Sequence, residues 1–128
     1  MDQKGEVRTF LERWAKTTQA RDAEHAADLY LRVPPALVTF SDGERSEDWL
    51  DIRVRLERDF ARSFIEHVEP HDIQITEPSD DVLLLSYAYD LHVRDMWGTP
   101  KVATKHATMA LVRTKDGLRI ASAHFSST

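Results

Sequence analysis

The feature that most constrains the fold is a long run of alternating side chains in the second half of the chain. Between Val82 and Arg94, every second residue is large and apolar, which predicts a β-strand with one buried face. The buried set is Leu83, Leu85, Tyr87, Tyr89, Leu91 and Val93. The opposite set is smaller or more polar, so a sheet built from this strand needs helices on one side only.

Further strands continue this pattern. We predict strands over Lys101–Arg113 and Leu118–Ser126, joined by a turn at Asp116-Gly117. A shorter alternating segment lies around Ile73. Consecutive strands joined by short turns pair antiparallel, so the second half of the chain is predicted to form one antiparallel sheet.

The first half has helical periodicity instead. One helix face is formed by Val7, Phe10, Leu11, Trp14 and Thr18. We predict a second helix with Asp22 as its N-cap and an apolar stripe that runs to Leu31. Pro34 and Pro35 end it. A third helix is expected to begin near Ser46, with an apolar face formed by Trp49, Ile52, Leu56, Phe60 and Phe64.

A short hairpin with its turn at Asp42-Gly43 is predicted between the second and third helices. Helices in one half of the chain and antiparallel strands in the other form an α+β fold. No repeat, linker or low-complexity tract divides the sequence, so we predict a single domain over residues 1–128.

Composition narrows the choice of partners. The formal net charge is −5 and no block of lysine and arginine occurs, so we expect no nucleic-acid partner. No apolar run approaches the ~20 residues of a membrane helix, and we expect no membrane partner. Cysteine is absent, which excludes disulfides and thiolate chemistry. A cytoplasmic location is the expectation.

The last strand contains His124 four residues from the C-terminus. We assign to the concave, helix-covered face Leu118, Ile120, Ser122, His124 and Ser126. We assign to the outer face, small and flat enough for another subunit, Ala121, Ala123 and Phe125. An inward histidine is either a general acid or base or a buried neutral imidazole, and both interpretations stay open.

The run ATMALVRTKDGLRIASAHFS resembles the C-terminal hairpin of SnoaL-like domains, in the superfamily of nuclear transport factor 2 and ketosteroid isomerase. The matching residues are Asp116, Gly117, Arg119, Ile120, His124 and Ser126. Leu118 stands where tryptophan is usual, and Ser122 where a second histidine is common. The order of the other predicted elements resembles the family over nearly the whole chain.

This resemblance implies a cone-shaped, curved antiparallel sheet wrapped around the three helices of the N-terminal half, with a pocket at the wide end. It also implies a homodimer through the outer sheet face, which agrees with the assignment of Ala121, Ala123 and Phe125. The fold hosts isomerases, dehydratases, epoxide hydrolases and cyclases as well as catalytically silent modules, so it does not imply one activity.

In such a cone, the predicted pocket lining is Trp14, Tyr30, Phe40, Trp49, Phe60, Tyr87, Tyr89, Met109 and His124. The alternative is that these residues only fill the core. An apolar aromatic cavity suits a small, flat hydrophobic ligand.

The candidate catalytic residues are His124, Tyr30, Tyr89 and Asp90. A tyrosine hydroxyl can donate a hydrogen bond to a carbonyl or enolate oxygen. The strand register points Asp90 outward, and only a one-residue slip would turn it inward. His92 and His106 lie on strands beside that of His124, but their faces do not agree with a zinc site. We expect neither a metal nor a cofactor.

Two functions remain at this point. The first is a protein that binds a small hydrophobic molecule, with acid–base chemistry of the isomerase, cyclase or dehydratase type on a polyketide-, terpenoid- or steroid-like substrate. The second is a non-catalytic dimerisation or ligand-sensing module.

Overall fold

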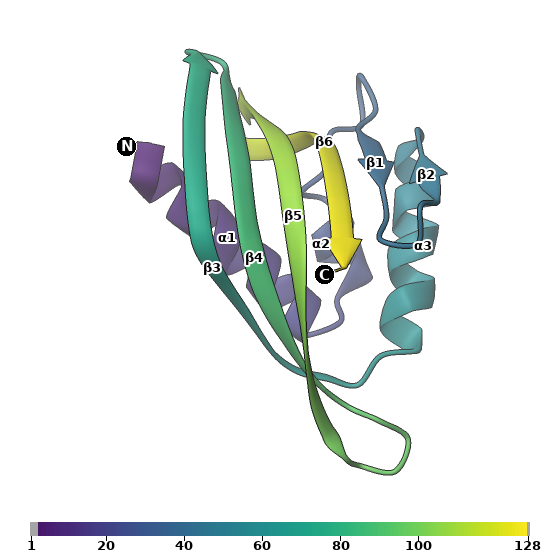
Figure 1. Cartoon of the computed structure of the whole chain (residues 1–128). Coiled ribbons are helices and arrows are strands. Elements are labelled where there is room, and N and C mark those ends of the chain that lie inside the picture. Colours follow the sequence, from purple (N-terminus) through teal and green to yellow (C-terminus); the bar gives the residue numbers. More distant parts are fainter. Residues whose placement is uncertain (1–2, 128) are drawn as a thin grey trace.

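The computed structural model describes residues 3–127, which form helices packed on one face of a curved, unclosed sheet (Figure 1). The helices are α1 (Gln3–Gln19), α2 (Ala23–Ala27) and α3 (Trp49–Ala61). The strands are β1 (Leu37–Thr39), β2 (Arg45–Ser46), β3 (Ile65–Ser79), β4 (Val82–Arg94), β5 (Pro100–Thr114) and β6 (Gly117–Ser127). This arrangement confirms the predicted α+β fold.

The helices bury the faces that their periodicity predicts, with two differences. Asp22 caps α2 by accepting a hydrogen bond from the backbone N–H of His25 at 3.1 Å. Helix α2 ends at Ala27, earlier than predicted, and Tyr30 forms an isolated bridge with β6 instead. Helix α3 ends before Phe64, which is 59% exposed and does not belong to its apolar face.

The six strands follow the order β2-β1-β6-β5-β4-β3, with β1 parallel to β6 and the other pairs antiparallel. Strand β4 has the predicted bounds and pairs with β5 without a register shift. Its large alternate residues therefore face the helices, as predicted. Strand β3 begins at Ile65, before the segment predicted around Ile73. Pro70 is compatible with β3 because β3 is an edge strand.

A bulge in β6 changes which of its side chains face the helices. Ile120 pairs with Leu111, whereas Ser122 pairs with the adjacent Ala110, so Ala121 is an extra residue in β6. One extra residue reverses the faces of all side chains that follow it.

The predicted faces of β6 are therefore wrong beyond Ile120. His124 is exposed on the outer face, whereas Ala123 is only 6% exposed in the core. Phe125 faces the helices and stacks on Phe40. Ala123 and Phe125 thus cannot form the outer dimer surface that the sequence predicted.

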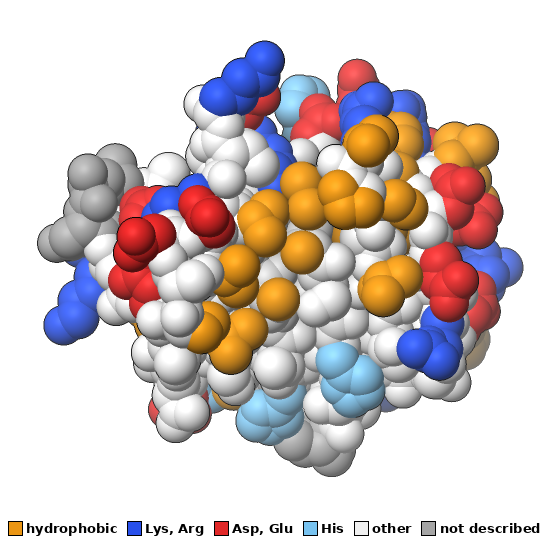
Figure 2. Space-filling model, turned by 90° about the horizontal axis from the view of Figure 1, so that it is seen from above, with side chains coloured by type: hydrophobic (Ala, Val, Ile, Leu, Met, Phe, Trp, Pro, Cys, Tyr) orange, Lys and Arg blue, Asp and Glu red, His pale blue; other side chains and the backbone are white. Residues whose placement is uncertain are grey.

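The molecular surface has apolar regions. Figure 2 shows a band of hydrophobic side chains across one end of the molecule, with charged groups on both sides of it. The exposed large apolar side chains include Val33, Leu37, Leu84, Met96, Trp97 and Val102. Within residues 3–127, no helix is long and apolar enough to cross a membrane.

Candidate functional site

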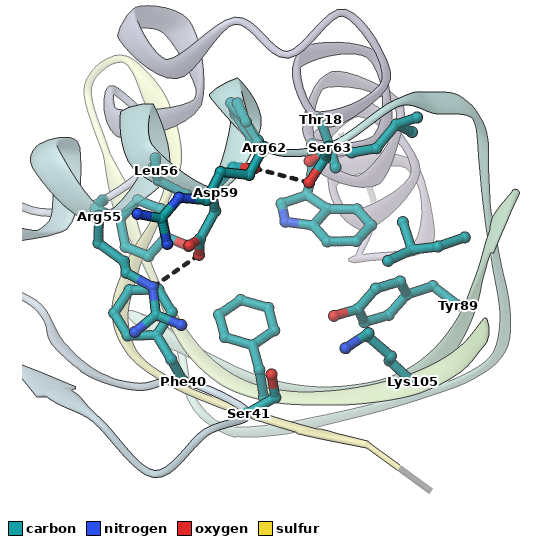
Figure 3. Close-up of a pocket in the computed structure, with 16 residues that line it drawn as sticks. Thr18, Phe40, Ser41, Arg55, Leu56, Asp59, Arg62, Ser63, Tyr89 and Lys105 are labelled. Atoms are coloured by element: carbon teal, nitrogen blue, oxygen red, sulfur yellow. Dashed lines mark hydrogen bonds and ion pairs between the residues drawn. The ribbon is translucent and has the colours of Figure 1, made fainter. Parts of the chain in front are cut away.

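A cavity of about 420 Å³ opens between α3 and the concave face of the sheet (Figure 3). Its volume lies within the range of roughly 300–1,000 Å³ that is usual for small-molecule sites. The lining residues are Trp14, Thr18, Tyr30, Phe40, Ser41, Arg55, Leu56, Asp59, Phe60, Arg62, Ser63, Ile65, Tyr89, Leu91, Lys105 and Phe125. The lining is mainly apolar and aromatic, and a few charged side chains interrupt it.

Aromatic rings form two walls of the cavity. The Trp14 ring packs edge-on against Tyr87 and Tyr89, with centroid distances of 5.2 and 4.9 Å. Phe40 and Phe125 stack at a centroid distance of 6.3 Å and an interplanar angle of 16°. Edge-on and stacked rings are favourable arrangements that hold these walls in place.

Two buried tyrosines line this cavity. Tyr30 is 4% exposed and Tyr89 is 6% exposed. Burial raises the pKa of both, and the proximity of Tyr89 raises that of Tyr30 further. Both hydroxyls therefore stay protonated at neutral pH. Within residues 3–127, neither hydroxyl makes a hydrogen bond, so both are available as donors to a ligand.

The α3 wall carries a network of ion pairs around Arg55, whose side chain is 9% exposed. Its Nε lies 2.7 Å from Oδ2 of Asp59, and its Nη2 lies 3.0 Å from Oδ2 of Asp42. Its Nη1 lies 3.4 Å from Glu44, and the guanidinium stacks over Phe40 at 4.3 Å. Arg55 therefore fixes the position of the Asp59 carboxylate at the cavity.

The opposite wall carries Tyr89 and Lys105, which are directly paired across β4 and β5. Figure 3 shows the Tyr89 hydroxyl and the Lys105 amine pointing into the open space from the sheet, opposite Asp59 and Arg55. Nζ of Lys105 donates a hydrogen bond to Oγ of Ser127 at 3.2 Å. The cavity thus has an aromatic interior with polar groups on two facing walls.

The SnoaL-like domain model matches residues 7–128 of this sequence. The chain belongs to the SnoaL-like domain family. Among curated proteins, none matches the sequence significantly. The family and the observed fold agree with the resemblance found in the sequence.

Solved structures show the same fold for this SnoaL-like domain. Aln2 from a Streptomyces species is 19% identical, with a TM-score of 0.84 over 97% of this chain and 89% of that one. A candidate dehydratase of the nuclear transport factor 2-like family from Streptomyces avermitilis is 15% identical, with a TM-score of 0.81 over 97% and 95%. A candidate calcium/calmodulin-dependent protein kinase II association domain from Xanthomonas campestris is 15% identical, with a TM-score of 0.83 over 100% and 89%.

The structure brings some of the residues predicted for the pocket together in the SnoaL-like cavity. Those that line it are Trp14, Tyr30, Phe40, Phe60 and Tyr89. Tyr87 and Met109 are each 1% exposed and belong to the packed core. Trp49 packs between helices, where its Nε1 donates to the carbonyl oxygen of Ala27 at 2.8 Å. These three side chains do not line the cavity.

The other predicted catalytic residues, His124 and Asp90, lie away from the cavity on the outer sheet face. The bulge at Ala121 turns His124 outward. Asp90 points outward, as its register predicts, and accepts hydrogen bonds from Thr104 at 2.7 Å and His71 at 3.1 Å. The hypothesis that His124 acts in the pocket is therefore wrong.

The expectation that the faces of His92, His106 and His124 do not agree is wrong. All three lie on the outer face of β4, β5 and β6, but on different rows of the sheet. Within residues 3–127, no group of three or more histidine or carboxylate side chains is arranged to hold a metal ion.

Sequence reasoning missed the charged residues of the cavity. Arg55 and Asp59 are four residues apart and lie beside the apolar stripe of Leu56 and Phe60 on α3. The sequence pattern places them on the solvated side of that helix. Lys105 has the same parity along β5 as the apolar residues Ala107 and Met109, which face inward. This shared parity is the sequence signal that could have placed Lys105 on the concave face.

Proposed function

We propose that this SnoaL-like domain binds a small, flat hydrophobic molecule with a carbonyl group in the cavity, and that it catalyses acid–base chemistry on that molecule without a cofactor. One observation carries this proposal: two buried tyrosines with protonated hydroxyls line the same mainly apolar cavity as Asp59. A carbonyl oxygen beside Tyr30 or Tyr89 would receive the hydrogen bond that these hydroxyls lack. Asp59 replaces His124 as the proposed base.

The chemical step is proton removal beside the carbonyl group. Asp59 takes the proton, the electrons of the broken C–H bond form the enolate, and the negative charge develops on the oxygen. Tyr30 and Tyr89 donate hydrogen bonds to that oxygen. Oδ2 of Asp59 accepts from Arg55, whereas among the described residues Oδ1 has only Nε of Arg58, at 3.8 Å. Oδ1 is therefore the proposed proton acceptor.

The same enolate step serves isomerases, cyclases and dehydratases, so the proposal covers these reaction types together. The aromatic walls favour a flat polyketide-, terpenoid- or steroid-like substrate. The description of the Streptomyces avermitilis neighbour as a candidate dehydratase is compatible with this chemistry, although it concerns that protein.

The test is exchange of α-protons with solvent deuterium, followed by proton NMR on 2-tetralone, a flat bicyclic ketone. The wild-type protein is expected to accelerate exchange, and Asp59→Asn should reduce the acceleration by at least about a hundredfold. Tyr89→Phe should reduce it by a similar factor. Glu57→Gln is the matched control, because Glu57 lies on the same helix and pairs with Arg53 on the exposed side. Equal exchange rates in Asp59→Asn and wild type would reject the proposed base.

An assembly role is the second candidate, favoured by apolar residues on the outer face of the sheet. Leu84 is 44% exposed and Leu37 is 54% exposed, and their strand partners Ala110 and Ser122 connect them in one row. We propose that a second copy of the chain covers this row, in place of the surface predicted from Ala123 and Phe125. Sedimentation velocity should show a dimer that Leu84→Glu converts to monomer. A wild-type monomer would reject this role.

A further inference from the structure

Lys105 differs from the two paired arginines on the concave side of the molecule, Arg55 and Arg113. Arg62 also lines the cavity and makes no ion pair within residues 3–127, but it is exposed to solvent. Arg55 pairs with Asp59 and Asp42 at 2.7 and 3.0 Å. Arg113, on the same face of β5 as Lys105, pairs with Glu6 and Glu77 at 2.9 and 2.7 Å. Lys105 has no such partner: within residues 3–127, its amine bonds only to the neutral Ser127 hydroxyl.

The surroundings of this lysine favour an anionic partner in the cavity. Lys105 is half-buried and lines an aromatic cavity, and its inward neighbours along β5 are Ala107 and Met109. An ammonium group loses hydration in such surroundings, and a negative partner offsets that loss. The Asp59 carboxylate, which also lines the cavity, is already held by Arg55.

We propose that the ligand carries a permanent negative charge, a carboxylate or a group of similar chemistry, and that Lys105 binds it. This inference rests on the proposed function and names the substrate class of the same cavity: an aromatic or polycyclic acid. Lys105 and Tyr89 are adjacent on one wall, as Figure 3 shows, so the acidic group and the carbonyl oxygen would lie at neighbouring positions of the ligand. The rings of the ligand would contact Trp14 and Phe125.

The test compares two fluorescent probes with the same ring system. 8-Anilino-1-naphthalenesulfonate is an anion, and N-phenyl-1-naphthylamine is its neutral counterpart. We expect the wild-type protein to bind the anion at least about tenfold more tightly, a difference that high salt should reduce. Lys105→Met should abolish this preference and leave the affinity for the neutral probe unchanged.

Lys101→Met is the matched control. Lys101 lies on the same strand, but its side chain is 65% exposed and its nearest carboxylate, Asp95, is 3.9 Å away. Its substitution removes the same net charge from the protein, and it should change the affinity for neither probe. Circular dichroism would show that both variants are folded.

The outcomes separate this inference from the proposed function. Equal binding of both probes by wild type, or an equal loss of anion affinity in both lysine variants, would overturn the anion site and leave the hydrophobic pocket in place. Weaker binding of both probes by Lys105→Met would show that Lys105 contributes packing rather than charge. This result would also overturn the anion site. Binding of neither probe would overturn the anion site and the pocket together.

Discussion

The two faces of the sheet are built from the same strands but differ in what they bury. On the concave face of β4, Leu83, Leu85 and Tyr87 are at most 1% exposed. On the outer face of the same strand, Leu84 is 44% exposed and Asp90 bonds to Thr104 and His71. The concave face is therefore expected to determine stability and ligand binding. The outer face is expected to respond to pH and to association with another copy.

Adjacent leucines on β4 provide the strongest test of this difference. Leu85→Ala leaves a cavity in the core and should cost about 2–5 kcal/mol of unfolding free energy. Leu84→Ala removes the same atoms from the outer face and should cost about 1 kcal/mol or less. Urea unfolding measures both values. Equal costs at all protein concentrations would show that the two faces do not differ in burial. Equal costs that depend on protein concentration would indicate that a second copy covers Leu84.

Arg55 is expected to give the next largest effect, because its substitution removes the cation that Asp59 and Asp42 share. These carboxylates are 40% and 52% exposed, so solvent reduces the cost of Arg55→Met to about 1–2 kcal/mol. Arg53→Met is the control, since the ion pair of Arg53 with Glu57, at 3.0 Å, is exposed to solvent. Thermal unfolding should show a larger loss of stability for Arg55→Met than for Arg53→Met. Equal losses of stability would show that the ion pairs of Arg55 contribute no more than one exposed pair.

Tyr87 and Tyr89 share the concave face but should respond differently to loss of the hydroxyl. The Tyr87 hydroxyl is fully buried and has no hydrogen-bond partner among the described residues. Tyr87→Phe should therefore stabilise the protein by about 1 kcal/mol, with ligand affinity unchanged. Tyr89→Phe should weaken binding of a carbonyl ligand and leave stability nearly unchanged. Chemical denaturation together with calorimetric titration distinguishes the two, and a loss of stability in Tyr87→Phe would indicate a bound water.

The smallest effect is expected on the outer face and depends on pH. Hydrogen bonds to Asp90 and then Asp72 raise the pKa of His71. Its contribution to stability is therefore complete below the ordinary value of 6.5 and is lost as pH rises through the folded value. Hydrogen bonds from Thr104 and then His71 lower the pKa of Asp90, so its contribution is complete above 3.8 and is lost as pH falls through the folded value.

The difference in Tm between wild type and His71→Gln should consequently be small, largest between pH 3.8 and 6.5, and smaller at higher pH. A difference that grows above neutral pH would contradict the assignment of this pair. Tyr87→Phe serves as the control on the other face, because its effect should not vary across this range.

Most of the fold could be predicted from the sequence, because neighbouring residues in most elements differ clearly in size and polarity. Strand β4 has its predicted bounds, since large apolar side chains alternate with smaller ones between clear turn residues. The segment after Ile120 offers no such contrast: alanines and serines occupy both faces around the bulge at Ala121. The face of His124 therefore could not be read from alternation.

The polar part of the candidate site was harder to predict, because its members are far apart in the sequence. Asp59 looks like an ordinary surface carboxylate on α3, and only the curvature of the sheet places it opposite Lys105. The aromatic walls were easier to predict from the sequence, since Trp14, Tyr30 and Tyr89 each belong to an apolar helix stripe or an apolar strand face.

The three tryptophans can show directly whether the concave cavity is the ligand site. Trp14 lines the cavity, the Trp49 indole bonds to Ala27, and Trp97 is 84% exposed in the β4–β5 loop. We would titrate ¹⁵N-labelled protein with N-phenyl-1-naphthylamine and follow the three indole N–H signals by NMR. Binding in the cavity should give a saturable shift of the Trp14 signal while that of Trp97 stays in place. A saturable shift of Trp97 or Trp49, with Trp14 unchanged, would show that the ligand binds elsewhere.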